Sequence, residues 1–135
     1  MPSSNEILNG TYAAWRIALR DPRAVTWLDD SVSGVWKSFV AAILVLPYYF
    51  LATWQQLADT SSVSATLPMI ILVESICYAL GWLIFPLLVH HFCVSTQREH
   101  LFRRFLVALN WSALVQMIVL LPLVLVDASH ILPYD

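Results

Sequence analysis

The sequence predicts an all-α polytopic membrane protein with three transmembrane helices. Three apolar stretches, at about 36–58, 63–91 and 104–126, are each long enough to cross a bilayer. Roughly 20 helical residues are needed to span a hydrocarbon core about 30 Å thick. Hydrophobic residues make up 59% of the chain and charged residues only 12%, which is typical of a lipid-soluble protein rather than of a soluble domain.

The basic residues predict how the chain is oriented in the membrane. All seven lie before or at the start of the first span, or between the second span and the start of the third: Arg16, Arg20, Arg23, Lys37, Arg98, Arg103 and Arg104. The connection at 59–62 and the tail after Val126 contain no Lys or Arg. By the positive-inside rule, we expect the N-terminus and the loop at 90–104 to be cytoplasmic and the C-terminus to lie outside.

We expect a single membrane domain over 1–135, in which a cytoplasmic interfacial segment, 1–35, precedes the transmembrane helices and short loops of 36–135. Residues 6–20 predict an amphipathic helix, because four apolar residues fall on one helical face at spacings of four, three and four. These residues are Leu8, Tyr12, Trp15 and Leu19. This face could enter the membrane interface, or the helix could pack on the protein's own cytoplasmic loop. Pro22 is expected to end the helix.

The first span should begin after a run of capping residues and carry an aromatic anchor at each end. Any of four polar residues can cap its N-terminus: Asp29, Asp30, Ser31 and Ser33. Trp36 and Trp54 are separated by about 27 Å of helix, close to the distance between the two membrane interfaces. Pro47 lies between them and should kink the helix, and Pro86 and Pro122 repeat this feature in the other spans.

Small residues four apart predict faces on which helices pack closely, within the chain or against a partner. Three pairs have this spacing: Ser75 with Ala79, Cys77 with Gly81, and Ala108 with Ser112. The two cysteines, Cys77 and Cys93, are about four turns apart on one helix and cannot bridge each other. We expect both to be reduced, buried thiols with a structural role.

Glu74 is the acidic residue that lies deep in a span, and it is the first candidate for function. A carboxyl group in hydrocarbon must be protonated, paired or turned toward a polar cavity. Counted from the outer ends of their spans, Glu74 and Gln116 lie at similar depth and could share a hydrogen bond that holds the helices together. Alternatively, Glu74 exchanges protons or binds a cation with help from Ser75 and Tyr78, or contacts a partner. Asn110, just inside the third span, also needs a hydrogen-bond partner.

Three histidines are weak candidates for a metal or haem site: His90 and His91 at the cytoplasmic end of the second span, and His100 shortly after it. Adjacent histidines on a helix diverge by about 100 degrees and no pair is four apart, so we predict interfacial hydrogen bonding and no metal, although a single histidine could hold a pigment or haem. Five arginines are expected to face lipid headgroups at the interface. They are Arg16, Arg20, Arg98, Arg103 and Arg104.

The stretches "ALRDPRAVTWLDDSVSGVWKSF" and "LNWSALVQMIVLLP" resemble the bacterial relatives of the Yip1-type multispan membrane proteins. Members of that family are similar to one another as small five-span proteins without known catalytic residues, and the eukaryotic ones are associated with vesicle trafficking and membrane shaping. The resemblance covers the interfacial N-terminus and three spans. It implies a function other than catalysis, and two further spans that do not occur in this chain.

From these features we expect a non-catalytic subunit that packs in, or organises, a membrane complex or the membrane itself. Its partners would be lipids and other membrane subunits or copies of itself, with no cofactor and no nucleic acid. The alternative is a proton- or cation-linked transporter or channel component centred on Glu74. An enzyme acting on lipids would need a polar cluster in the loop at 90–104, and no catalytic set can be assembled there. The compact loops and the family resemblance favour the inner membrane of a bacterium.

Overall fold

The computed structural model describes the backbone of residues 1–58 and 66–131 and the side chains of residues 1–57 and 66–126. Throughout this part of the chain the regular structure is helical, without a strand, as the sequence predicted. The elements are α1 (Ser4–Ala18), the 3-10 helix η1 (Pro22–Trp27), α2 (Val32–Ser38), α3 (Val40–Ala58), α4 (Leu67–Ser95) and α5 (Glu99–Ile131).

Three helical segments are long and apolar enough to cross a membrane: Val32–Leu57, Leu67–Ser95 and Glu99–Val126. This confirms the predicted all-helical architecture with three helices that are long and apolar enough to span a membrane. The second helix continues four residues past the predicted 91, and the third begins five residues before the predicted 104. Helical hydrogen bonding thus extends beyond the apolar stretch into the polar ends. The predicted start at 63 lies outside the described residues.

The first span consists of two helices, because α2 ends at Ser38 and α3 begins at Val40. Ser31 is the residue that caps it: its side chain accepts a hydrogen bond from the Gly34 amide at 3.0 Å, as an N-cap serine does. Trp36 and Trp54 are both well exposed, at opposite ends of this span, which is where interfacial anchors are expected.

α1 ends before Pro22 is reached, so the prediction that this proline terminates the helix is wrong. The chain turns at Arg20, whose φ of 63° is left-handed, and the amides of Arg20 and Asp21 donate to the carbonyls of Ile17 and Arg16. This pair of bonds is the Schellman arrangement that satisfies the last carbonyls of a helix. Pro22 instead begins η1, at a position where its missing N–H costs nothing.

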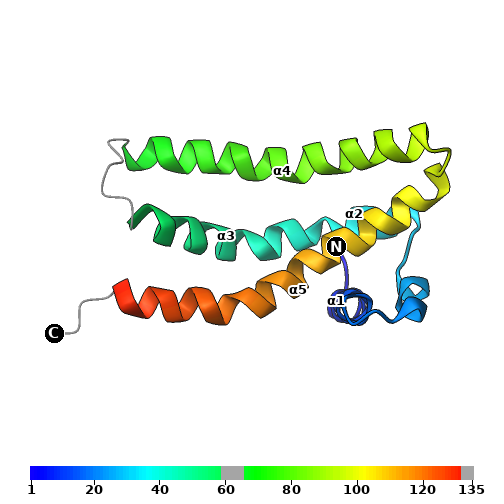
Figure 1. The fold of residues 1–135 in the computed structure, drawn as a ribbon, viewed down its shortest axis with the longest axis horizontal. Coiled ribbons are helices and arrows are strands. Elements are labelled where there is room, and N and C mark those ends of the chain that lie inside the picture. The colour runs from blue at the N-terminus through cyan, green and yellow to red at the C-terminus, as the bar shows by residue number, and fades with distance from the viewer. Residues whose placement is uncertain (59–65, 132–135) are drawn as a thin grey trace.

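The long helices run side by side, and α1 lies across them (Figure 1). The backbones of α3 and α5 pack most closely, α1 packs against α5, and the backbone of α4 comes nearer to α5 than to α3. Figure 1 shows α4 and α5 meeting at the turn that joins them and separating toward their other ends, where α3 runs between them. We call the end of the bundle that carries α1 and the α4–α5 turn the basic end, because the seven Lys and Arg residues belong to its elements.

The buried apolar core lies where α1, α3 and α5 meet. Its members are Ala13, Ala14, Leu28, Ala41, Val107, Trp111, Leu114 and Val115. Helix α4 is outside this core, since no residue in its most apolar 18-residue window is buried. The small residues of α4 that the sequence pairs four apart are all exposed: Ser75, Cys77, Ala79 and Gly81. The described chain therefore buries none of them, whereas Ala108 on α5 does pack on the core.

Candidate functional site

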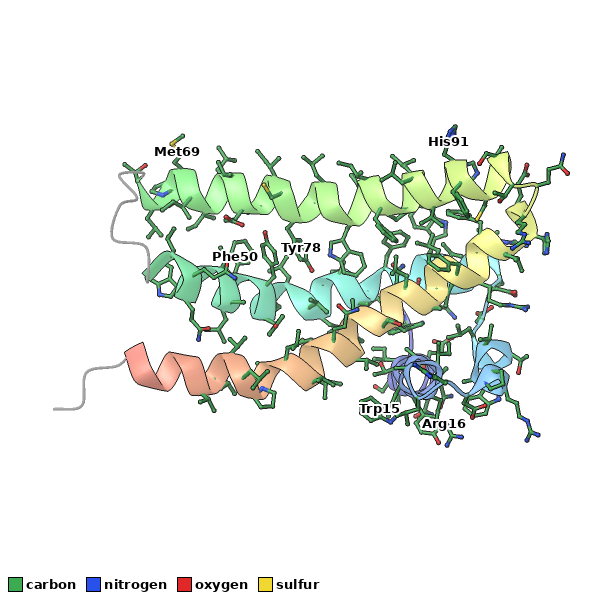
Figure 2. All side chains as sticks on the ribbon, in the orientation of Figure 1. Trp15, Arg16, Phe50, Met69, Tyr78 and His91 are labelled. Atoms are coloured by element: carbon green, nitrogen blue, oxygen red, sulfur yellow. The ribbon has the colours of Figure 1, made fainter. Side chains whose placement is uncertain are left out.

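The amphipathic helix α1 uses two faces. Its small residues Gly10, Ala13 and Ala14 are buried, so the helix docks on α5 and not on a loop. The predicted apolar face points the other way, with Leu8 and Leu19 exposed by 66% and 60%. Side chains on α1 extend away from the long helices, as the labelled Trp15 and Arg16 show (Figure 2). An apolar face turned away from the protein is what a helix lying in a membrane interface presents.

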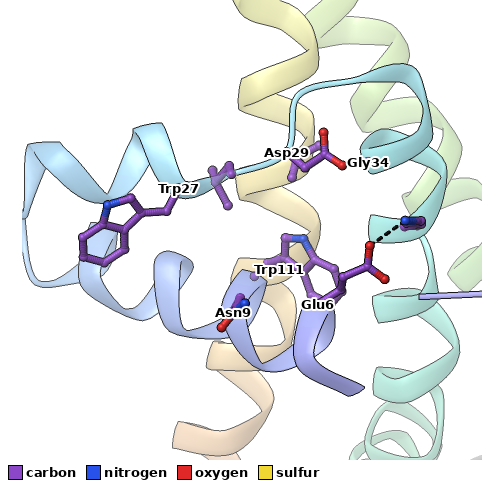
Figure 3. A pocket seen from close by; sticks show the side chains of 10 residues that line it. Glu6, Asn9, Trp27, Asp29, Gly34 and Trp111 are labelled. Carbon is purple, nitrogen blue, oxygen red and sulfur yellow. Dashed lines mark hydrogen bonds and ion pairs between the residues drawn. The ribbon is translucent and has the colours of Figure 1, made fainter. Parts of the chain in front are cut away.

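A small cavity lies where α1 meets the start of α2. It has a volume of about 200 Å³ and is lined by residues that include Glu6, Asn9, Trp27, Asp29 and Trp111 (Figure 3). Across it, the Lys37 ammonium donates to Glu6 Oε1 at 2.5 Å. This bond to Lys37, together with the Ser3 amide bond of the capping box, lowers the pKa of Glu6 to about 2. The ion pair therefore fastens the first turn of α1 to α2.

Two of the arginines predicted to face lipid headgroups are held in ion pairs within the protein. The Arg16 guanidinium contacts Asp21 Oδ2 at 2.6 Å, and this contact raises the pKa of Arg16. The Arg104 guanidinium contacts Asp30 Oδ2 at 2.7 Å and ties α5 to the cap of α2. Among the described residues no ion pair engages the other three, Arg20, Arg98 and Arg103.

Glu74 pairs with Tyr49, which was not among the predicted partners. The Tyr49 hydroxyl on α3 donates to Glu74 Oε2 at 2.7 Å, and no hydrogen bond joins Glu74 to Gln116, so the expected pairing is wrong. The groups proposed to help Glu74 bind a cation donate to backbone carbonyls instead: Ser75 to Ile71 and Tyr78 to Ala42. Glu74 thus connects α4 to α3, and its geometry is that of a packing contact.

Aromatic side chains fill the space between α3 and α4. The rings of Tyr49 and Tyr78 lie 4.7 Å apart, and Trp82 contacts both Tyr78 and Phe39 at ring distances of 6.2 and 6.5 Å. Figure 2 shows Tyr78 extending from α4 toward α3 and Phe50 extending from α3 toward α4. Aromatic side chains, rather than close approach of the backbones, therefore join α4 to α3.

Asn110 is buried at the centre of the bundle, and only one of its two side-chain polar atoms has a hydrogen-bond partner. Its Nδ2 donates to the Ser38 hydroxyl at 2.8 Å, and that hydroxyl donates in turn to the Val35 carbonyl. The Oδ1 atom of Asn110 is buried and has no hydrogen-bond partner. The expected interhelical partner is thus present for the amide nitrogen and missing for the oxygen. Gln55, which was not among the predicted intramembrane polar residues, is also buried and donates to the Val124 carbonyl at 2.6 Å.

The histidines and cysteines form no metal site in the part of the chain that the structure describes. His90 and His91 are both exposed, and His90 packs its ring edge-on to Phe102. Both cysteines are free thiols. Cys93 is buried as predicted, but Cys77 is exposed, because α4 does not turn that face into the core.

A larger cavity, of about 420 Å³, lies between α4 and α5 at the level of the spans, and Tyr49 of α3 also lines it. Asn110 and Gln116 of α5 line it as well. The structure therefore brings two of the three predicted intramembrane polar residues to one cavity, and it places Glu74 outside the set of residues that line it.

No family model, curated protein or solved structure matches this chain. Its function must therefore be inferred from the geometry of α4, α5 and the interfacial helix.

Proposed function

We propose that this protein is a non-catalytic subunit of a larger membrane complex and that α4 is the helix that packs against its partner. The observation that carries this proposal is the exposure of α4, whose most apolar 18 residues include none that is buried. The buried core residues come from α1, α3, α5 and Leu28, and α4 adds to them only the partly buried Trp82. The bundle of α1, α3 and α5 holds α4 through the α4–α5 turn and through the aromatic contacts between α3 and α4.

The side of α4 that points away from the bundle has a pattern suited to a second helix. We call the residues on it the outer stripe: Met69, Leu72, Ile76, Ala79, Leu83 and Leu87. The large members are about half exposed or more, and Met69 and His91 point outward at the two ends of α4 (Figure 2). Ala79 lies in the middle of the stripe, and Ser75 lies four residues before it. Small residues among large ones let two helix backbones approach closely in a membrane.

The orientation and the lipid contacts belong to the same proposal. The basic residues favour a cytoplasmic N-terminus and α4–α5 turn. The compact loops and the resemblance to the Yip1-type proteins favour the inner membrane of a bacterium. In this orientation α1 lies at the cytoplasmic interface with its apolar face in the acyl boundary, and Arg20, Arg98 and Arg103 contact anionic headgroups. The resemblance to the Yip1-type proteins stays a prediction that agrees with a role other than catalysis.

The test is purification of the tagged protein from its own membrane into lipid nanodiscs, followed by native mass determination. We expect a stoichiometric partner to copurify with the wild-type protein. The Ala79→Leu variant should lose most of that partner, because the added side chain holds the helices apart. Gly81→Leu is the matched control, since it adds the same side chain to α4 two residues away, on the side facing the cavity.

Three results would contradict the proposal. Recovery of the wild-type protein alone, as a monomer or as a homo-oligomer, would show that it is not a subunit of a larger complex. A partner that persists in Ala79→Leu would show that the outer stripe is not the contact. Loss of the partner in Gly81→Leu but not in Ala79→Leu would place the contact in the cavity between α4 and α5.

A further inference from the structure

The cavity between α4 and α5 has the size and lining of a binding site for a small apolar molecule. Its volume is about 420 Å³, within the range of cavities that hold organic ligands in proteins. It lies at the level of the spans, so a ligand would reach it from the lipid. The α4 side is formed by residues from Cys77 to Pro86, and the α5 side by residues from Leu109 to Gln116.

The aromatic lining presents ring faces and edges rather than free hydroxyl groups. Tyr49, Tyr78, Trp82 and Phe85 all line the cavity. The Tyr49 hydroxyl is engaged by Glu74 and the Tyr78 hydroxyl by the Ala42 carbonyl. Because both tyrosines donate elsewhere, they offer the cavity mainly apolar ring surface. Such rings favour stacked or edge-to-face contact with another flat ring.

Asn110 supplies an acceptor that the protein leaves unused. The residue is 1% exposed and lines the cavity. The Ser38 hydroxyl donates its proton to Val35 and can only accept from Asn110 Nδ2, which leaves Oδ1 as the free atom of the amide. Buried polar atoms in folded proteins nearly always have a partner. A ligand that satisfies this oxygen must carry a hydrogen-bond donor.

Gly81 leaves room for the ligand on the α4 side. A Cβ atom built at this position would meet nothing within 4 Å, although Gly81 lines the cavity. In the middle of a helix an alanine would be the more stable residue if nothing else were needed there. The absence of a side chain leaves this space to the cavity between α4 and α5.

We propose that this cavity binds a membrane-soluble ring compound with a hydroxyl group, of the phenol or hydroquinone class. The ring lies among Tyr49, Tyr78 and Trp82, and the hydroxyl donates to Asn110 Oδ1. The site is independent of the outer stripe, because Ala79 does not line the cavity. The ligand can therefore bind whether or not α4 has a partner.

The test uses 4-hexylphenol as the probe and its methyl ether as the matched ligand without a donor. Heats of binding are measured with the full chain in lipid nanodiscs, after subtraction of partitioning into empty nanodiscs. We expect saturable binding of one phenol per chain, and binding of the ether that is at least tenfold weaker. Gly81→Leu should weaken phenol binding at least tenfold by filling the cavity, while Ala79→Leu should leave it unchanged.

Asn110→Leu separates the hydrogen bond from the shape of the cavity. In this variant the phenol and the ether should bind with equal affinity, and Gly81→Leu still tests the site if Asn110→Leu does not fold. The absence of saturable binding to the wild-type protein would overturn the proposal. So would equal binding of phenol and ether to the wild-type protein, or unchanged binding in Gly81→Leu.

Discussion

Gly10 of α1 lies directly against the indole ring of Trp111 on α5. A Cβ atom at position 10 would come within 2.5 Å of Trp111 Cε2, closer than real side-chain contacts allow. Trp111 is itself 5% exposed and belongs to the core, so its ring has little room to move. The absence of a side chain at position 10 is therefore what lets α1 dock across the bundle.

Gly10→Ala should separate α1 from α5. Overpacking of a close contact costs about 1–3 kcal/mol, and we expect a loss of that size in the free energy of unfolding in detergent. Hydrogen exchange over residues 4–18 should rise as well. Gly81→Ala is the control, because it makes the same change where no atom lies within 4 Å, and it should stabilise the protein by roughly 0.5–1 kcal/mol. Equal effects of the two substitutions would contradict the proposed docking.

The Glu6–Lys37 ion pair should make α1 docking depend on pH. Pairing depresses the pKa of Glu6 from its ordinary value of 4.5 to about 2. The folded protein thus binds this proton less readily than the unfolded chain, so the contribution to stability is complete above pH 4.5. It is lost as the pH falls toward 2. Because the pair is exposed, salt should weaken it too.

Hydrogen exchange of residues 4–18, followed from pH 6 to pH 2, measures this effect. Glu6→Gln removes the titrating group while it keeps a similar shape. The difference between wild type and variant should shrink as the pH falls from 4.5 to 2. Asp21, whose pKa is lowered by Arg16, titrates in both proteins and cancels in the comparison. A difference that does not change over this range would rule out the ion pair as the cause.

The spans were predictable because their length and apolar composition are set by the bilayer, whatever surrounds them. The position of α4 was not predictable, since a helix that is apolar on every face has no periodicity to show which side is buried. The apolar face of α1 was identified correctly, but its docking surface was not. That surface consists of Gly10, Ala13 and Ala14, which carry almost no hydrophobic signal.

The partner of Glu74 could have been predicted from the sequence by comparing depths within a different pair of spans. Helices α3 and α4 are consecutive, and Tyr49 lies nine residues before the end of α3 while Glu74 lies seven after the start of α4. Counting across this connection puts the two at similar depth. Counting across α4 and α5 suggested Gln116 instead. Depth alone cannot show which neighbouring helix a side chain faces, and this is why Gln116 was the wrong partner for Glu74.

The hydrogen bond between Ser38 and Asn110 should couple α2 to α5. Ser38→Ala leaves the Asn110 amide nitrogen unpaired in a buried site, and we expect a loss of about 1–3 kcal/mol in the free energy of unfolding. A double-mutant cycle with Asn110→Leu should give a coupling energy of roughly 0.5–3 kcal/mol. Ser112→Ala is the control, since its hydroxyl donates to the Ala108 carbonyl within α5. Additive effects of the two core substitutions would contradict the coupling.

The turn between α4 and α5 should be stabilised by glycine at position 97. Gln97 has a left-handed φ of 58°, and the amides of Gln97 and Arg98 donate to the carbonyls of Val94 and Cys93, as in a Schellman motif. A non-glycine residue pays about 1–2 kcal/mol for this conformation. Gln97→Gly should therefore raise the free energy of unfolding by about 1 kcal/mol, whereas Ser95→Gly, inside the helix, should lower it. A destabilising Gln97→Gly would contradict this reading.

The contact between Tyr49 and Glu74 distinguishes a packing role from proton transfer. Tyr49→Phe removes the donor to Glu74 and should lower the free energy of unfolding by about 1–3 kcal/mol. Glu74→Gln retains an acceptor for Tyr49 and should change stability by less than about 0.5 kcal/mol. In proteoliposomes under a pH gradient, wild type, Glu74→Gln and empty vesicles should show equal proton flux. A wild-type flux abolished by Glu74→Gln would instead establish Glu74 as a proton-carrying group, because the amide preserves shape and hydrogen bonding but cannot ionise.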